Sequence, residues 1–374
     1  MRKLFYPVPI DEIRDETPDA YTLFFLPPDP VAFRYEAGQY LTLRTWIGEA
    51  EHRRAFSLSS SPLTDSRLGV TIKRVDKGLV SNHLRDAFEA GDELEIMPPM
   101  GRFTVVPDPG RSRNYVLIGA GSGITPLFSI LKTVLAGEPL SKVTLWYGCR
   151  DESSVIFYDQ LRALQAQYAP RLELYLTLTQ PAEGWKGFRG RLDQRRIYDL
   201  LSELFMEDEF RKVYYVCGPQ GMMDAAHAAF DKHAVNFADV HQEFFSAPLP
   251  PEEEVLAAHS GTNGQSAAPV QDVLADGEEV YTIERREVQV LLGGETHLLT
   301  VEPEQSILDA AIQARLDPPY ACQSGICTTC RAMLHAGAVA MDESEGLSED
   351  ELRQGYILTC QSHPLTESVV VEFG

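Results

Sequence analysis

The chain has 374 residues, of which 44% are hydrophobic, and its formal net charge at pH 7 is −22. A chain of this length predicts two or three domains, each able to bury a core of its own. The strong acidic excess argues against nucleic acid or an anionic membrane as a partner.

No apolar run approaches the ~20 residues that a membrane-spanning helix needs. The opening residues, MRKLFYPVPIDEIRDE, lack the apolar region of a secretory signal, so we expect a cytoplasmic protein. In that reducing compartment, grouped cysteines are more often metal ligands or catalytic groups than disulfides.

Residues 1–107 contain short runs that are typical of strands, separated by Gly, Pro and Asp. The runs are AYTLFFL, QYLTLRTW, RAFSLSS, LGVTIKRV and DELEIMPP. Their spacing predicts an antiparallel β-barrel or sandwich.

In residues 108–245 the pattern changes to an apolar strand followed by a helical segment, three times over. The pairs are NYVLIGAG with ITPLFSILKTVL, KVTLWYG with VIFYDQLRALQAQY, and KVYYVCG with GMMDAAHAAFDKH. This alternation predicts an α/β domain in which helices wrap a parallel sheet.

Residues 246–277 are rich in Pro, Ala, Ser, Gly and Gln, and we interpret them as a linker. Residues 278–374 form a third predicted domain, with 17 acidic and 5 basic side chains. Two apolar runs around Gly293-Gly294 predict a hairpin. SILDAAIQARL predicts a helix, with Ser306 and Asp309 in capping-box spacing. The acidic surface serves either solubility or attraction to a basic partner.

Four cysteines gather in this third domain. Cys322, Cys327 and Cys330 have C-x4-C-x2-C spacing, and Cys360 follows thirty residues later. Four thiolates suit either a zinc ion or an iron–sulfur cluster. Structural zinc prefers two short C-x2-C pairs, whereas the spacing found here is that of plant-type [2Fe–2S] proteins. We therefore predict a [2Fe–2S] cluster, with zinc as the alternative.

On this motif, residues from about 279 to 374 resemble a plant-type ferredoxin domain. The resemblance implies an α+β fold of the β-grasp type. It also implies that Cys322 and Cys327 hold one iron, and that Cys330 and Cys360 hold the other.

The second domain has two glycine-containing turns at strand ends. YVLIGAGSGITPLFSIL passes from a strand into a helix, where backbone amides can approach a pyrophosphate. Because Ile124 holds the last position of a G-x-G-x-x-G pattern, an ordinary strand–turn–helix is the alternative. VCGPQGMM ends a later strand. The residues of the two turns are Gly119, Gly121, Gly123, Cys217, Gly218 and Pro219.

These turns resemble the pyridine-nucleotide domain of the ferredoxin–NADP reductase superfamily. The resemblance implies that the first turn, with Thr125 and Pro126, holds the pyrophosphate, and that the Cys-Gly-Pro turn lies beside the nicotinamide. Cys217 would then shape hydride transfer, and a buried core thiol is the alternative. Cys149 is interpreted as a filler of the core or surface.

The same superfamily has an R-x-Y-S flavin motif in the preceding barrel, and RAFS matches it with Phe56 in place of Tyr. The resemblance implies that Arg54 pairs with a flavin phosphate, that the Phe56 ring covers the cofactor, and that Ser57 hydrogen-bonds near N5. A G-x-x-S motif, which favours FAD over FMN, is implied to bind the pyrophosphate. The flavin-binding candidates are Arg54, Phe56, Ser57, Leu58, Ser59, Arg74, Gly78, Leu79, Val80 and Ser81.

HQEFF closes the second domain. Related reductases have a terminal Glu-x-aromatic near the flavin, so Glu243 and Phe245 are candidates, with capping of the last strand as the alternative. The candidate catalytic residues are Ser57, Cys217 and Glu243. At the end of VTLWYG, Arg150 precedes two acids, and an arginine there favours the 2′-phosphate of NADPH over NADH.

The domain order implies electron transfer from NAD(P)H through FAD to the cluster and then to a partner. Nearly the whole chain resembles reductase components of bacterial multicomponent oxygenases. The tail GYILTCQSHPLTESVVVEF is most similar to the reductases of ring-1,2-phenylacetyl-CoA epoxidases, which predicts an epoxidase partner in phenylacetate degradation. The alternatives are a steroid or aromatic-ring hydroxylase, a non-oxygenase acceptor, and a zinc-stapled carrier without redox activity.

Overall fold

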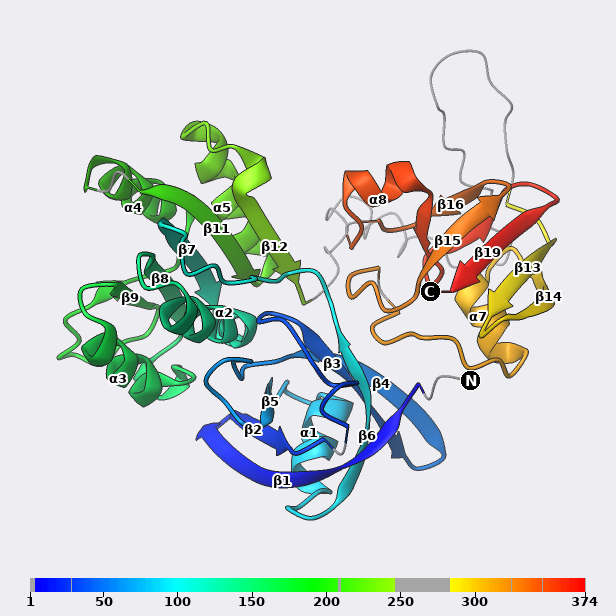
Figure 1. The fold of residues 1–374 in the computed structure, drawn as a ribbon, viewed down its shortest axis with the longest axis horizontal. Coiled ribbons are helices and arrows are strands. Elements are labelled where there is room, and N and C mark those ends of the chain that lie inside the picture. Colours follow the sequence, from blue (N-terminus) through cyan, green and yellow to red (C-terminus); the bar gives the residue numbers. More distant parts are fainter. Residues whose placement is uncertain are drawn as a thin grey trace, which may run out of the picture. The chain divides into compact units, whose positions relative to one another are not determined.

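The computed structural model describes residues 4–27, 29–207, 210–245, 283–323, 325–344 and 346–373. The chain forms two compact units, Lys3–Phe245 and a C-terminal unit that begins at Ser246; Figure 1 shows their helices and strands. The predicted linker, residues 246–277, lies outside the described residues.

The first part of the Lys3–Phe245 unit is an antiparallel sheet in the order β4-β3-β6-β1-β2-β5. Its ends meet through a bridge between Leu58 and Val70 and a hydrogen bond from the Ser59 amide to the Gly69 carbonyl (2.8 Å). The sheet therefore closes, and the predicted barrel is confirmed. Its elements are β1 Tyr6–Thr17, β2 Ala20–Phe25, β3 Tyr40–Ile47, β4 Ala50–Ser57, β5 Leu68–Lys73, α1 Leu79–Asp86 and β6 Glu93–Met100.

Strand β1 is a barrel strand that the sequence patterns did not predict. Two prolines and several charged residues obscure the alternation of polar and apolar side chains along it. Pro7 and Pro9 lie where β1 pairs with β6, before its pairing with β2 begins at Ile10. A proline lacks the N–H that a second neighbouring strand would need, so this one-sided stretch tolerates both prolines.

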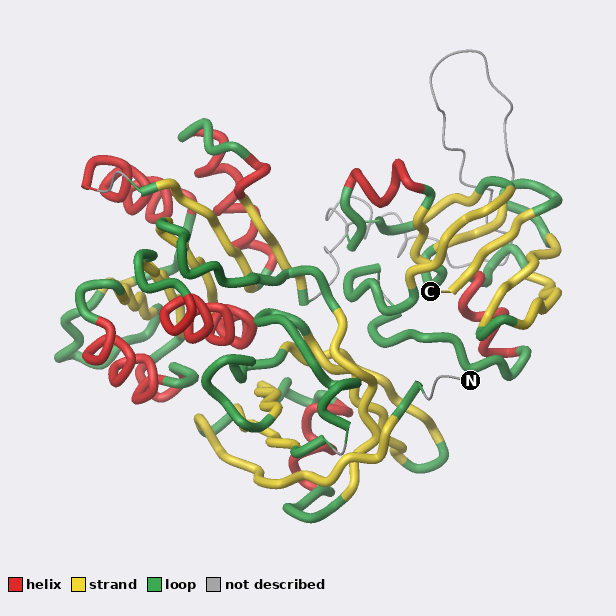
Figure 2. The backbone as a smooth tube through the Cα atoms, in the orientation of Figure 1, coloured by secondary structure: helices red, strands yellow, loops and turns green. Residues whose placement is uncertain are grey.

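The second part of this unit is a parallel sheet in the order β10-β9-β8-β7-β11-β12. The strands are β7 Arg113–Ala120, β8 Lys142–Cys149, β9 Leu172–Leu178, β10 Phe188–Arg189, β11 Arg211–Gly218 and β12 Val240–Phe244. The helices are α2 Ile124–Gly137, α3 Tyr158–Tyr168, α4 Gln194–Glu207 and α5 Gln220–Lys232. Figure 2 shows these helices flanking the strands, which confirms the predicted α/β fold.

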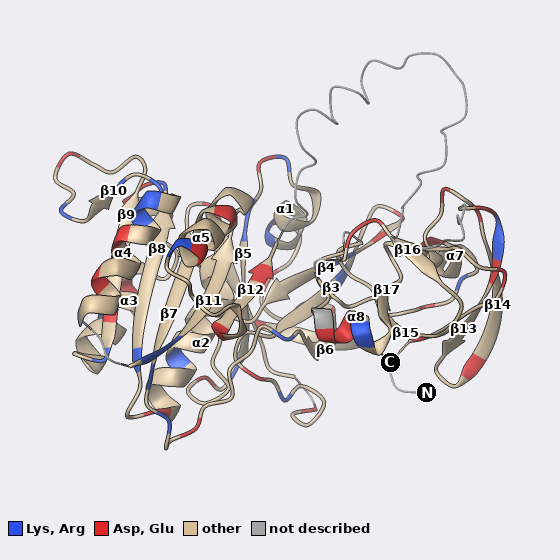
Figure 3. Ribbon diagram, turned by 90° about the horizontal axis from the view of Figure 1, so that it is seen from above, with Lys and Arg blue, Asp and Glu red and all other residues tan. Residues whose placement is uncertain are grey.

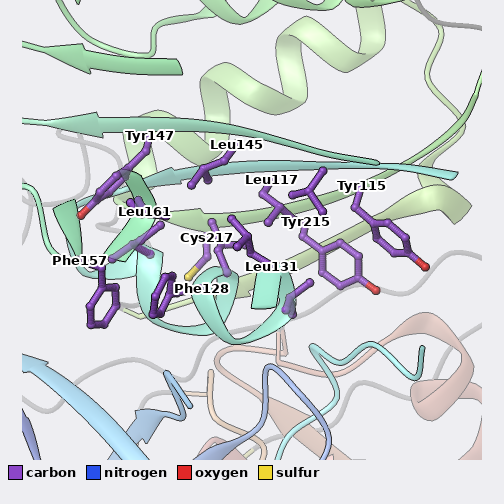
Figure 4. Packing of buried hydrophobic residues seen from close by; sticks show 14 of the residues in the cluster. Tyr115, Leu117, Phe128, Leu131, Leu145, Tyr147, Phe157, Leu161, Tyr215 and Cys217 are labelled. Carbon is purple, nitrogen blue, oxygen red and sulfur yellow. The ribbon is translucent and has the colours of Figure 1, made fainter. Parts of the chain in front are cut away.

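Successive side chains of the parallel strands enter two different cores. Leu117, Leu145 and Tyr215 pack toward α2 and α3 (Figure 4). Ile118 and Val216 pack with residues of α4 and α5 on the other face. The basic residues of β7, β8 and β11 stand at the amino ends of these strands (Figure 3). At their carboxyl ends the same strands carry small and apolar residues.

Helix α3 begins at Tyr158, three residues later than the predicted helical segment. The preceding residue, Phe157, has a left-handed backbone with a φ of 63°. Its ring is buried and stacks on Phe128 of α2, with the ring centroids 4.3 Å apart. The left-handed backbone and the buried ring of Phe157 keep the residues before Tyr158 out of the helix.

A polar seam joins the barrel to α2 within the Lys3–Phe245 unit. The Ser129 hydroxyl donates to the Ser60 carbonyl, the hydroxyls of Ser61 and Thr133 lie 2.7 Å apart, and Lys132 pairs with Asp65. The four hydroxyl-bearing residues are at most 3% exposed. Each buried polar group that lost its partner would cost about 1–3 kcal/mol. The seam therefore holds α2 against the segment that follows β4.

The C-terminal unit contains a mixed sheet in the order β14-β13-β19-β15-β17, with β13 and β19 parallel and the other pairs antiparallel. A second, two-stranded sheet pairs β16 with β18. The elements are β13 Arg286–Leu292, β14 Glu295–Val301, α7 Ile307–Gln313, β15 Arg331–Ala336, β16 Val339–Met341, α8 Glu349–Gln354, β17 Tyr356–Leu358, β18 Ser362–Pro364 and β19 Val369–Phe373.

Local signals in this unit are confirmed. The turn between β13 and β14 contains Gly293 and Gly294, both with positive φ. Helix α7 begins with a capping box, in which the Asp309 amide donates to the Ser306 hydroxyl and the Ser306 amide donates to the Asp309 carboxylate, both at 3.1 Å. Throughout the described ranges, every helix falls short of the length and hydrophobicity that a membrane crossing requires.

Candidate functional site

Strands β7 and β11 are neighbours, but the chain leaves them toward opposite sides of the sheet. In open α/β sheets, ligands bind at such a switch point, outside the carboxyl ends of the strands. Both predicted turns lie here. A Cβ atom on Gly123 would stand 2.0 Å from the Cys217 carbonyl oxygen, so only glycine fits this contact. The fold thus brings the two turns together.

The first turn leads directly into α2. Gly119 is the last residue but one of β7 and packs against the Leu127 side chain. The Thr125 hydroxyl donates to the Ser122 carbonyl at 3.0 Å. Pro126 lies in the first turn of the helix, where a missing N–H costs nothing. The Tyr147 hydroxyl donates to the Gly121 carbonyl at 3.0 Å. The amino end of α2 is thus a braced turn of the kind that binds phosphate groups.

Cys217 lies at the carboxyl end of β11, with a fully buried side chain. Its sulfur points into the apolar core beside α2 (Figure 4). Burial holds the pKa of this thiol well above its usual range, and the charge of Glu243 acts in the same direction. The thiol is therefore neutral. Pro219 follows as the residue that caps α5, with Gly218 between them.

Ser57 and Glu243 lie 186 residues apart in the sequence and meet in the structure. The buried Ser57 hydroxyl, at the end of β4, donates to a Glu243 carboxyl oxygen at 2.9 Å. Glu243 lies opposite Cys217 in the pairing of β12 with β11. Burial of the carboxyl group raises the pKa of Glu243 to about 8, although the hydrogen bond from Ser57 opposes this. The raised pKa favours the neutral, protonated form of this carboxyl group.

The other residues of the flavin motif divide between the two faces of β4. Arg54 is exposed and Phe56 is half-buried, and these alternate positions share one face. The neighbouring Arg53 is buried and pairs with Glu51 at 2.6 Å. Beyond the strand, Leu58 is fully buried in the barrel core. Ser59 is buried as well, and its hydroxyl lies against the Gly69 carbonyl and the Thr71 hydroxyl.

The G-x-x-S motif forms the start of α1. Gly78 precedes the helix, and the Ser81 hydroxyl accepts from the Val75 amide at 3.2 Å. Leu79 is exposed, whereas Val80 is buried. The Arg74 guanidinium donates to Asn82 at 2.7 Å and to Asp86 at 2.9 Å. Arg74 also borders an open cavity of about 540 Å³, which is lined by Asp15, Glu16, Tyr21, Arg85 and Asp86 among others.

Two further candidates, Arg150 and Phe245, are exposed just beyond the ends of β8 and β12. Arg150 is exposed just after β8 and donates to the Asp151 carboxylate at 3.0 Å. The hydrogen bonds of Asp151 with Ser153 and Arg150 lower its pKa to about 2. Phe245 follows β12 with 42% of its surface exposed.

The four cysteines of the C-terminal unit lie in two pairs. The amides of Cys322 and Cys327 each donate to the other residue's sulfur at 3.4 Å. The thiols of Cys330 and Cys360 contact each other, and this contact raises the pKa of Cys330 and lowers that of Cys360. A two-iron cluster takes two thiolates on each iron, so these pairs fit the group.

The loop that carries the first three cysteines has an unusual backbone. Gln323, Gly325 and Thr328 all have positive φ, between 53° and 76°. A Cβ atom on Gly325 would stand 2.8 Å from the side chain of Glu343, so both the backbone and the available space require glycine. The amides of Cys322 and Cys327 in this loop donate to sulfur atoms.

Two polar side chains beside the cysteines were not predicted as site residues. The Thr329 hydroxyl lies 3.1 Å from the Cys327 sulfur, and the Gln361 amide lies 3.5 Å from the Cys360 sulfur. The only sequence signal for Thr329 is its position between Cys327 and Cys330. A lone glutamine after Cys360 has no signal of its own. The seam residues Ser129 and Thr133 likewise occupy ordinary helix positions in the sequence pattern.

Three family models match the sequence. Residues 7–105 match the oxidoreductase FAD-binding domain, residues 117–228 the oxidoreductase NAD-binding domain, and residues 290–365 the 2Fe-2S iron-sulfur cluster binding domain. The protein is therefore an oxidoreductase that combines FAD-binding, NAD-binding and [2Fe–2S] domains in one chain.

Relatives match the chain from end to end. One of the subunits of 1,2-phenylacetyl-CoA epoxidase from Escherichia coli (strain K12) is 34% identical, and the match covers 99% of this chain and 98% of the relative. The ferredoxin reductase component of 3-ketosteroid-9-alpha-monooxygenase from Rhodococcus rhodochrous is 35% identical, with 97% and 95% covered. The chain belongs to this family, the reductase components of oxygenase systems.

Solved structures share the fold. Phthalate dioxygenase reductase is 22% identical, with a TM-score of 0.58 over 99% of this chain and 98% of that chain. An intact type IV self-sufficient cytochrome P450 monooxygenase is 19% identical, with a TM-score of 0.67 over 98% of this chain. The match covers 41% of the P450 chain, so this chain spans less than half of its length.

The contact between Gly123 and Cys217 predicts a specific loss of coenzyme binding. Gly123→Ala places a methyl group against the Cys217 carbonyl and displaces the turn. We expect the KM for the reduced coenzyme to rise at least about tenfold, while the absorbance of bound FAD is kept. Gly221→Ala is the matched control, because a Cβ there meets no atom within 4 Å. Equal KM values for the two variants would contradict the assignment of this turn.

The raised pKa of Glu243 predicts a pH-dependent penalty on stability. Between the ordinary pKa of 4.5 and about 8, the folded protein holds a proton that the unfolded chain releases, so stability falls as the pH rises. Glu243→Gln removes this dependence. From pH 5 to pH 9, the variant should gain about 1–3 kcal/mol relative to wild type. Thermal unfolding across this range measures it, with exposed Glu203→Gln as the control. A constant difference would show that Glu243 is ionised throughout.

Proposed function

We propose that this protein takes electrons from NADPH and delivers them to the oxygenase component of a phenylacetyl-CoA epoxidase. The support is the end-to-end likeness to the Escherichia coli protein of that system, at 34% identity over 99% of this chain. The steroid monooxygenase reductase is as similar in identity, and it is therefore the rival. Both relatives match this chain over nearly its whole length, so coverage does not distinguish between them.

We assign the flavin site to the face of β4 that carries Arg54 and Phe56, together with the start of α1. When bound, FAD supplies an acceptor for the hydride of the coenzyme and a donor of single electrons. The exposed guanidinium of Arg54 is available to a phosphate, and the Phe56 ring is available for stacking. Gly78 and Ser81 open the helix whose amino end suits the pyrophosphate.

We assign Ser57 and Glu243 as the polar pair of the catalytic centre. Their hydrogen bond holds a proton at the carboxyl ends of β11 and β12, beside the switch point where the coenzyme would enter. Because its raised pKa keeps the Cys217 thiol neutral, we assign it a steric role only. Its carbonyl, pressed against Gly123, sets how closely the two turns approach each other.

We assign Cys322 and Cys327 to one iron of the [2Fe–2S] cluster, and Cys330 and Cys360 to the other. The pairwise contacts of the thiols and the amides directed at them support this assignment. Zinc would place four thiolates on one ion, and the metal content and visible colour of the purified protein distinguish the two.

We assign Arg150 to the 2′-phosphate of NADPH. It lies at the carboxyl end of β8, where the ribose of a bound dinucleotide is expected. Arg150→Ala should lower kcat/KM for NADPH at least about tenfold and leave that for NADH nearly unchanged, because only NADPH has the phosphate. Arg162→Ala, an exposed arginine of α3, is the control. A wild-type protein that prefers NADH would overturn the assignment.

The acceptor is tested by comparing two oxygenases in separate mixtures. The protein, reduced with NADPH under argon, is mixed with the oxygenase component of a phenylacetyl-CoA epoxidase or of a 3-ketosteroid-9-alpha-monooxygenase, and product is measured after air is admitted. We expect product in the first mixture, with at least about a tenfold excess in rate over the second. The Cys360→Ser variant is the control: its flavin should still be reduced, but product formation should stop. Faster turnover with the steroid oxygenase would reject the epoxidase assignment.

A further inference from the structure

A side-chain amide lies against the last of the four cysteines. Gln361 follows Cys360 directly, in the turn between β17 and β18. Its nitrogen lies 3.5 Å from the Cys360 sulfur, 2.9 Å from the Cys360 carbonyl oxygen and 3.2 Å from the Gln323 carbonyl oxygen. This side chain therefore bridges the cysteine loop and the fourth cysteine.

The two carbonyl oxygens determine which end of the amide faces the sulfur. A carbonyl accepts hydrogen bonds and offers none, so the NH2 end of Gln361 must face Cys360 and Gln323. If the amide were turned over, its oxygen would face two other oxygens. The NH2 group has two N–H donors for these three acceptors, so at least one N–H is shared between two of them, and the group is held beside the Cys360 sulfur.

The glutamine is also held in place along its length. Its backbone amide donates to the Leu358 carbonyl at 2.9 Å, and its carbonyl accepts from the Asp342 amide at 3.0 Å. A Cβ atom on Gly325 would stand 3.2 Å from the Gln361 Cγ atom, so the side-chain stem packs closely over the loop. With both ends constrained, the amide cannot swing away without breaking several contacts.

We propose that Gln361 raises the reduction potential of the [2Fe–2S] cluster through its hydrogen bond to the Cys360 sulfur. Reduction adds negative charge to the cluster and its sulfur ligands. A hydrogen-bond donor aimed at a ligand sulfur stabilises that charge, and so makes the reduced form easier to reach. This positioning role depends on the [2Fe–2S] domain and is independent of which oxygenase accepts the electrons.

The test measures the potential of the cluster in the complete protein. Gln361→Met keeps the length of the side chain and removes the N–H groups, and Gln361→Glu replaces them with a negative charge. We expect a more negative midpoint potential in the Met variant and a larger shift in the Glu variant, followed by EPR during anaerobic redox titration. The flavin midpoint in the same titration should not move. An unchanged or more positive cluster potential in Gln361→Met would overturn the proposal.

Gln305→Met is the matched control, because that amide donates to Gln313 at 2.8 Å, away from the cysteine loop. A second measurement detects the hydrogen bond itself in the wild-type protein. In wild-type protein with side-chain ¹⁵N-labelled glutamine, pulsed EPR of the reduced cluster should detect a coupled amide nitrogen. The coupling should persist in Gln305→Met. Its absence from a fully loaded wild-type protein would also reject the proposal, while leaving the function of the domain untouched.

Discussion

Where β7 and β11 end, the backbone of Gly123 runs against the carbonyl of Cys217, and no side chain fits between them. Through this contact, the two turns of the nucleotide domain form one continuous surface. Because β12 pairs in register with β11, the position of Cys217 also sets that of Glu243. Glu243 in turn meets Ser57 of the barrel. A single close approach of two backbones thus helps to determine where the nucleotide domain meets the end of β4 in the barrel.

The polar seam maintains this arrangement from the other side of α2. This helix begins at the Gly123 turn, and about two and three turns later its buried hydroxyls bond to Ser60 and Ser61. Those two serines directly follow the flavin motif in the chain. A shift of the helix would therefore move the Gly123 turn and the end of β4 together. Hydroxyl pairs suit this role because their hydrogen bonds are directional, whereas apolar packing alone tolerates sliding.

Much of the fold could be predicted from the sequence because its signals are local. Alternating runs, glycine turns and the capping box of Ser306 act within a few residues of chain. Strand β1 was not predicted because its two prolines conceal the alternation of polar and apolar side chains. The pairing of Ser57 with Glu243 has no local signal, since topology alone joins positions 186 residues apart. A resemblance between motifs suggested that both residues matter, but their hydrogen bond and the raised pKa of Glu243 required the structure. The Gln361 amide likewise depends on a loop conformation that no spacing rule describes.

The burial of Cys217 also affects how readily this thiol is oxidised. Reduced flavins that meet dioxygen release peroxide, and peroxide attacks thiolates that are exposed and easily ionised. Cys217 is neither, because its sulfur is enclosed and its pKa is raised. Cys149, at the end of β8, is buried too, and burial raises its pKa to about 11. The parallel sheet therefore keeps both thiols in a form that resists oxidation.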